Sequence, residues 1–87
     1  MNIMVYGLDP DGLTTALGFV EKDYNVVGFD ENRGNSAKIE IGELPFEEPE
    51  LDTILFNALD KSFSVTSDPA EAAAESDFIF FCIVFRP

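Results

Sequence analysis

Short apolar segments alternate along this chain with segments in which apolar residues recur at helical spacing. Residues 2–6 form an apolar run that ends at Gly7, a pattern typical of a buried parallel strand. Residues 13–20 place apolar side chains at positions i, i+3, i+4 and i+7, which predicts an amphipathic helix. Residues 24–29 then predict a second strand, which ends at Asp30. The chain therefore begins with a predicted strand, helix and strand.

The rest of the chain continues this alternation. A weak helical pattern, interrupted by small polar residues, covers 31–42, and helical spacing returns over 50–60. Residues 63–66 predict a short third strand. Residues 78–85 are an unbroken apolar run, which predicts a fourth strand that is central and fully buried.

The segment between the third and fourth predicted strands carries the residues typical of a helix start. Ser67 or Asp68 can cap a helix whose first residue is Pro69. Glu71 follows Asp68 by three residues, as in a capping box, and residues 70–75 are good helix formers. We therefore expect a short capped helix here.

The turn after the first strand carries most of a phosphate-binding motif. In a Gly-x-Gly-x-x-Gly turn, the first glycine permits the tight turn, the second admits a pyrophosphate, and the third lets the helix pack closely. Gly7 and Gly12 occupy the first and third positions, but the second is Asp9, and Pro10 lacks an N–H. Two like charges about 4 Å apart repel by roughly 4 kcal/mol at an effective dielectric of 20, so Asp9 opposes a phosphate, and Asp11 adds a second carboxylate.

The same acids have other interpretations. Asp9 or Asp11 can cap the helix and satisfy the dipole that a phosphate would otherwise satisfy. A divalent metal bound by these two residues with Asp30 and Glu31 is a further alternative, but the calcium-loop spacing is incomplete and ordinary turn acids are favoured. We therefore expect no metal site.

Asp30 stands where a Rossmann-type fold places an acid at the end of its second strand. A carboxylate there binds the ribose hydroxyls of a dinucleotide and favours NAD over NADP. The alternative is a polar residue that simply ends a strand. Together with Gly7 and Gly12, Asp30 predicts a dinucleotide-binding unit of strand, helix and strand.

The order of the elements predicts an α/β fold. Strands that alternate with helices favour a parallel sheet with right-handed crossovers. We expect half of a Rossmann-type three-layer sandwich, with four mainly parallel strands in the order 3-2-1-4. Residues 1–87 are enough for a single, partial NAD(P)-binding Rossmann-like domain.

The charge balance excludes some classes of partner. Seventeen acids face five bases, which gives a formal net charge of −12. Nucleic acids and anionic membranes are therefore not expected as partners, because phosphate recognition needs Lys and Arg. The acidity fits either a basic protein partner or, as the favoured interpretation, a solvated acidic surface.

The residue inventory also limits catalysis and location. The chain has no His, which removes the commonest general base, and Cys82 is its single cysteine, placed in an apolar run that favours an inert thiol. No apolar stretch is long enough to span a membrane, and the basic start of a signal peptide is missing. We expect a cytoplasmic protein with no catalytic residues.

On these motifs the sequence resembles the N-terminal NAD-binding domain of the UDP-glucose/GDP-mannose dehydrogenases. The most specific segment is the loop Gly-Glu-Leu-Pro-Phe-Glu-Glu-Pro-Glu-Leu, which simple Rossmann domains have no reason to carry. The resemblance implies an NAD-binding fold from an enzyme that oxidises a nucleotide-sugar hydroxyl to a carboxylate. The matching segments are Gly7 to Gly12 with 15–19, 24–30, 42–51, 66–72 and 76–82.

The departures from the family fall where the family holds NAD. Asp9 replaces the second glycine, and Asn35 stands where a basic residue is common near the adenosine ribose. The family's Cys-Val-Pro-Thr-Pro reads Cys-Ile-Val-Phe-Arg from Cys82 onward, so the threonine hydroxyl that would face the cofactor is lost. The family's catalytic residues lie beyond Pro87, and Cys82 matches the cysteine at the strand end rather than the nucleophile.

The resemblance therefore implies a truncated dehydrogenase-like domain that is not catalytic alone and binds NAD or a nucleotide weakly at most. The alternative is an interaction module that forms a homodimer, or docks on a protein partner, through the exposed edge of strand 78–85, which the family covers with its next strand. The candidate cofactor-binding residues are Gly7, Asp9, Asp11, Gly12, Asp30, Asn35 and Cys82.

Overall fold

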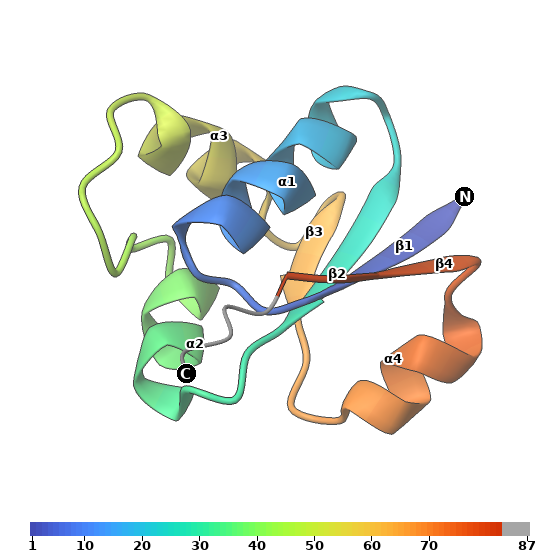
Figure 1. Cartoon of the computed structure of the whole chain (residues 1–87). Coiled ribbons are helices and arrows are strands. Elements are labelled where there is room, and N and C mark those ends of the chain that lie inside the picture. Colours follow the sequence, from blue (N-terminus) through green and yellow to red (C-terminus); the bar gives the residue numbers. More distant parts are fainter. Residues whose placement is uncertain (83–87) are drawn as a thin grey trace.

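The computed structural model describes residues 1–82 as a four-stranded parallel sheet with helices on both faces (Figure 1). The strands lie in the order β3-β2-β1-β4, and all three pairings are parallel. This confirms the predicted α/β fold and the predicted strand order. The elements are β1 (Asn2–Tyr6), α1 (Pro10–Glu21), β2 (Asn25–Phe29), α2 (Arg33–Glu40), α3 (Leu51–Ala58), β3 (Phe63–Val65), α4 (Pro69–Glu75) and β4 (Phe78–Phe81).

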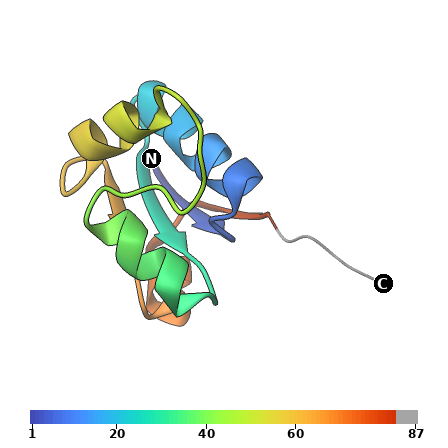
Figure 2. The ribbon, with the colours of Figure 1, turned by 90° about the vertical axis from the view of Figure 1, so that its left-hand side faces the viewer.

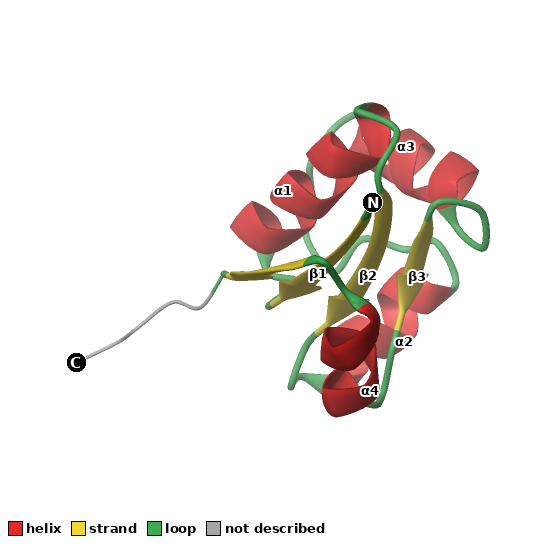
Figure 3. Cartoon of the chain, turned by 90° about the vertical axis from the view of Figure 1, so that its right-hand side faces the viewer, coloured by secondary structure: helices red, strands yellow, loops and turns green. Residues whose placement is uncertain are grey.

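The helices form two outer layers around the sheet. Helices α1 and α3 lie side by side over one face, and α4 lies on the opposite face (Figures 1 and 3). Right-handed crossovers between parallel strands produce this arrangement, because a helix that follows each strand packs back onto the sheet. The predicted helices are all present, including the weak one, which forms as α2.

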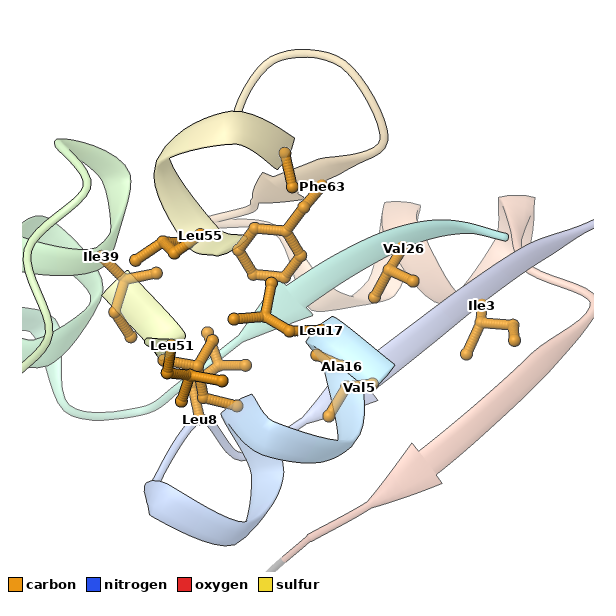
Figure 4. Packing of buried hydrophobic residues seen from close by; sticks show 12 residues of the cluster. Ile3, Val5, Leu8, Ala16, Leu17, Val26, Ile39, Leu51, Leu55 and Phe63 are labelled. Carbon is orange, nitrogen blue, oxygen red and sulfur yellow. The ribbon is translucent and has the colours of Figure 1, made fainter. Parts of the chain in front are cut away.

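The core lies between the sheet and the layer of α1 and α3. Val5 from β1, Leu17 from α1, Leu55 from α3 and Phe63 from β3 are almost completely buried and point toward one another (Figure 4). These side chains come from the apolar positions of each element, so the hydrophobic pattern of the sequence selects the face that each element buries.

The loop between α2 and α3 contributes to this core. It runs along one end of the domain (Figure 2), and its Leu44 and Phe46 pack against the buried cluster. Leu51 then opens α3 as a buried residue. The apolar residues of this loop therefore have a packing role.

The fourth strand is the exception to the predicted burial. The apolar run alone predicts a central, buried strand, whereas the predicted order 3-2-1-4 places the same strand at an edge. The structure agrees with the order: β4 is an outer strand, and all four of its residues are exposed, from 39% for Ile79 to 65% for Phe81. Within residues 1–82, β1 is the strand that pairs with β4. The burial prediction is therefore wrong for this part of the chain, because an apolar strand is buried only where neighbours cover it. The prediction for 83–85 lies outside the described residues.

Candidate cofactor-binding site

The turn between β1 and α1 is packed too closely for side chains at its two glycines. Gly7 has φ of +107°, a conformation that favours glycine, and a Cβ there would overlap the carbonyl oxygen of Cys82. A Cβ on Gly12 would overlap the carbonyl oxygen of Gly7. Both glycines are therefore needed for close contact among β1, α1 and the end of β4, with or without a ligand.

Asp9 caps helix α1 from within the turn. Its Oδ1 accepts a hydrogen bond from the N–H of Gly12 at 2.8 Å, and its carbonyl oxygen accepts one from Leu13 at 2.8 Å. Pro10 is the first helical residue, which suits a position without an N–H partner. Asp11 is exposed in the first turn of the helix, and its carbonyl oxygen accepts from the Thr15 hydroxyl. Of the two aspartates that can cap α1, Asp9 is therefore the one that does so.

Asp30 connects the turn to the end of β2. Its Oδ2 accepts from the N–H of Leu8 at 2.6 Å, and its Oδ1 accepts from the N–H of Asn32 at 2.7 Å. A carboxylate has about four lone-pair positions, so both oxygens keep capacity for ribose hydroxyls. The structure brings Asp30 to the turn, as expected, and the ribose contact remains a prediction.

Asn35 and Cys82 complete the predicted set. Asn35 lies in the first turn of α2, where its N–H donates to Oδ1 of Asn32 at 3.1 Å, so a role toward a nucleotide stays a prediction. Cys82 follows β4 beside Gly7, and its N–H donates to the carbonyl oxygen of Tyr6 at 2.8 Å. Burial and the nearby charge of Asp9 raise the pKa of the Cys82 thiol above its ordinary value.

The structure adds residues that the motif did not predict. The Tyr6 hydroxyl donates to Oε1 of Glu31 at 2.8 Å, and this hydrogen bond is the main reason why the pKa of Tyr6 is raised. The Tyr6 ring also contacts the rings of Phe29 and Phe81 on the two neighbouring strands. Aromatic residues in three apolar runs were the available signal, but the alignment of Tyr6, Phe29 and Phe81 depends on the register of the sheet.

A surface hollow of about 580 Å³ lies elsewhere, where α4 meets the sheet. Asn2, Ser64 and Glu75 are among its lining residues, and none of the seven candidate residues lines it. It therefore lies apart from the predicted cofactor site.

The comparisons with known proteins show the family to which the chain belongs. Residues 1–85 match the profile of the UDP-glucose/GDP-mannose dehydrogenase family, NAD binding domain. The chain belongs to this family. The match covers the glycine turn, Asp30 and the loop between α2 and α3 alike.

Individual members of the UDP-glucose/GDP-mannose dehydrogenase family show the same relationship. The chain is 32% identical over 84 residues to the UDP-glucose 6-dehydrogenase of Pseudomonas aeruginosa, covering 95% of this chain and 18% of that protein. It is 37% identical over 82 residues to a UDP-N-acetyl-D-mannosamine dehydrogenase of Methanococcus maripaludis, covering 93% and 18%.

Solved structures of family members superpose closely. A ternary complex of GDP-mannose dehydrogenase from Pseudomonas aeruginosa gives a TM-score of 0.90 at 28% identity, covering 97% of this chain and 20% of that one. The UDP-N-acetylmannosamine dehydrogenase of Pyrococcus horikoshii gives 0.87 at 36% identity, covering 95% and 20%. The chain thus spans about a fifth of the length of these family members.

Metal-binding groups and membrane-spanning helices are both absent from the described residues. Among residues 1–82, no three His, Cys, Asp or Glu side chains are grouped so as to hold a metal ion. In the same part of the chain, no helix has the length and apolar character needed to cross a bilayer.

The phosphate end of the site fits NAD poorly. A Rossmann turn binds a pyrophosphate through free N–H groups at the helix start. Here the Gly12 N–H is bonded to Asp9, the Leu8 N–H is bonded to Asp30, and Pro10 has none. The ribose end keeps the Asp30 carboxylate, whose contact with a ribose stays a prediction.

Proposed function

We propose that this chain is a non-catalytic NAD-binding-type domain of the nucleotide-sugar dehydrogenase family that binds NAD or a nucleotide weakly at most. The observation that carries the proposal is the hydrogen bond from Gly12 to Asp9, since it engages an N–H group that a phosphate would use. Gly7 and Gly12 would form the phosphate turn, with Asp30 on the ribose and Asn35 beside it. NAD, when bound, supplies a hydride acceptor.

The chemistry of the residues supports a role without catalysis. The chain has no His. Burial and the nearby charge of Asp9 raise the pKa of Cys82 above its ordinary value, so its reactive thiolate fraction near neutral pH is smaller than that of a free cysteine. A cytoplasmic location is part of the proposal.

Titration with NAD, followed by amide chemical shifts, tests this function. We expect small shifts at 7–13 and 30–35 that do not saturate below millimolar NAD. NADP should shift the same amides less, because its extra phosphate would face Asp30. The absence of shifts at millimolar NAD would contradict weak binding, and saturation at micromolar NAD would contradict the proposed penalty from Asp9.

Among residues 1–82, β1 is the one strand that pairs with β4, and this favours a second candidate function, an interaction module. Phe78, Phe80 and Phe81 are exposed on a strand whose outer backbone groups can pair with another strand. The proposed occupant is an extended apolar segment flanked by basic residues on a protein partner. A net charge of −12 supports this choice, because it attracts a basic partner and repels a second copy of the chain.

A pair of peptides tests the interaction module. A Val-Thr repeat flanked by lysines should shift the amides of 78–81, while the same repeat flanked by glutamates should not. Phe78→Thr should weaken the effect without unfolding the domain, because Phe78 is 53% exposed. Equal shifts with both peptides would contradict the charge argument. A stable dimer by light scattering, without a peptide, would make a second copy the occupant and overturn the basic-partner proposal.

A further inference from the structure

Two helices of this domain begin in the same way. Helix α1 starts at Asp9-Pro10, with the Asp9 Oδ1 accepting from the N–H of Gly12 at 2.8 Å. Helix α4 starts at Asp68-Pro69, with the Asp68 Oδ1 accepting from the N–H of Glu71 at 3.1 Å. An aspartate cap followed by proline is a self-sufficient helix start, since the carboxylate supplies both a hydrogen bond and a negative charge to the positive helix end. The glycine turn is therefore built like an ordinary capped helix.

Three further N–H groups of the turn, those of Gly7, Leu8 and Leu13, are engaged as well. Gly7 donates to the carbonyl oxygen of Phe29 at 2.7 Å, and Leu8 donates to the Asp30 carboxylate at 2.6 Å. Leu13 donates to the carbonyl oxygen of Asp9 as the first bond of the helix. These bonds hold the turn in place with groups of the protein alone.

We propose that the Asp9 carboxylate is a built-in replacement for the cofactor phosphate, which closes the phosphate half of the site. This inference rests on the proposed function, because it assumes that a dinucleotide would place its phosphates at this helix start. Asp9 takes the Gly12 N–H, places negative charge at the helix end, and occupies the position of the missing glycine. A phosphate entering the turn would have to displace this carboxylate and overcome its charge.

Substitution of Asp9 separates these contributions. Asp9→Gly removes the charge and the side chain, and NAD affinity should rise by about tenfold to a thousandfold, the upper bound corresponding to roughly 4 kcal/mol of repulsion. Asp9→Asn keeps the cap and the size but removes the charge, so its gain should be smaller. Inorganic pyrophosphate serves as a second probe, because a ligand of the native state raises the unfolding temperature. Pyrophosphate should raise the unfolding temperature of Asp9→Gly and leave the unfolding temperature of the unsubstituted protein unchanged.

Asp68→Gly is the matched control, since it removes the same kind of cap from α4. It should lower the unfolding temperature in the absence of ligand while gaining no affinity for NAD and no stabilisation by pyrophosphate. A gain equal to that of Asp9→Gly would overturn the proposal, because the effect would then be one of general charge. Asp9→Asn keeps the test decisive if Asp9→Gly fails to fold, since Asn caps helices about as well as Asp.

The outcomes for the inference and for the proposed function differ. No NAD shifts in the natural protein, together with binding by the folded Asp9→Gly variant, would reject weak binding and support the built-in replacement. Weak shifts in the natural protein, with no gain in folded Asp9→Gly or Asp9→Asn, would support the proposed function and overturn the inference.

Discussion

Strands β1 and β4 are neighbouring, mainly apolar strands with opposite surroundings. Met4 of β1 lies opposite Ile79 of β4 in the parallel register, yet Met4 is 1% exposed and Ile79 is 39% exposed. Strand β1 is paired on both sides and has helices on both faces, whereas β4 is paired with β1 alone among the described residues. Apolar character thus specifies a strand, but the number of covering neighbours determines its burial.

The largest expected loss of stability comes from adding a methyl group where β1 and α1 are in close contact. Gly12→Ala would place a Cβ on the carbonyl oxygen of Gly7, and neither backbone can move without disturbing β1 or α1. We expect a loss of more than about 3 kcal/mol in the free energy of unfolding, above the usual cost of overpacking and a large part of the roughly 5–15 kcal/mol that stabilises a domain. Urea denaturation followed by circular dichroism measures it.

Gly18→Ala is the control for this substitution, since it lies in the same helix with open space around the added Cβ. It should stabilise the domain by about 0.5–1 kcal/mol, because alanine favours a helix more than glycine does. Similar behaviour of the two variants would contradict the close packing of the turn.

The next effect compares the two strands on one rung of the sheet. Met4→Ala should cost about 2–5 kcal/mol, because it leaves a cavity in a covered layer. Ile79→Ala should cost about 1–2 kcal/mol, because its side chain is partly in water already. Equal losses in the free energy of unfolding, measured by urea denaturation, would show that β4 is covered in solution and would contradict the difference in burial between the two strands.

A smaller effect concerns the thiol at the end of β4. Burial and the charge of Asp9 raise the Cys82 pKa, so the thiol should react with iodoacetamide with a midpoint at higher pH than that of a free cysteine. Asp9→Asn should lower this midpoint only in part, because burial, the larger cause, remains. An unchanged midpoint would show that the charge of Asp9 does not contribute to the raised pKa of Cys82.

The smallest effect lies at the end of β1. The hydrogen bond to Glu31 and the nearby carboxylates raise the pKa of Tyr6, since they disfavour a phenolate. Absorbance titration at alkaline pH should show one tyrosine ionising late, and Glu31→Gln should move it toward the ordinary value. Asp77→Asn, at the opposite end of the sheet, should leave that titration unchanged.

Much of the site could be predicted from local sequence. Gly7, Gly12 and Asp30 were placed together by the spacing of a strand, a helix and a strand, and the structure brings them together. The choice between Asp9 and Asp11 as the cap could not be made, because both can reach a helix start and only the backbone path decides which one does. The bond from Leu8 to Asp30 was missed, since it joins two strand ends whose register the sequence does not state.

The order and type of the elements were determined by the sequence itself, because hydrophobic period, caps and turn residues act over a few neighbouring residues. The exposure of each β4 side chain and the choice of Asp9 over Asp11 as the helix cap were decided only in the tertiary structure. Burial depends on which elements cover a strand, and the turn depends on where separate strands end. Neither is a property of a local segment. An apolar run was therefore not enough to place β4 in the interior, and two correctly spaced glycines did not decide which carboxylate accepts the Gly12 N–H.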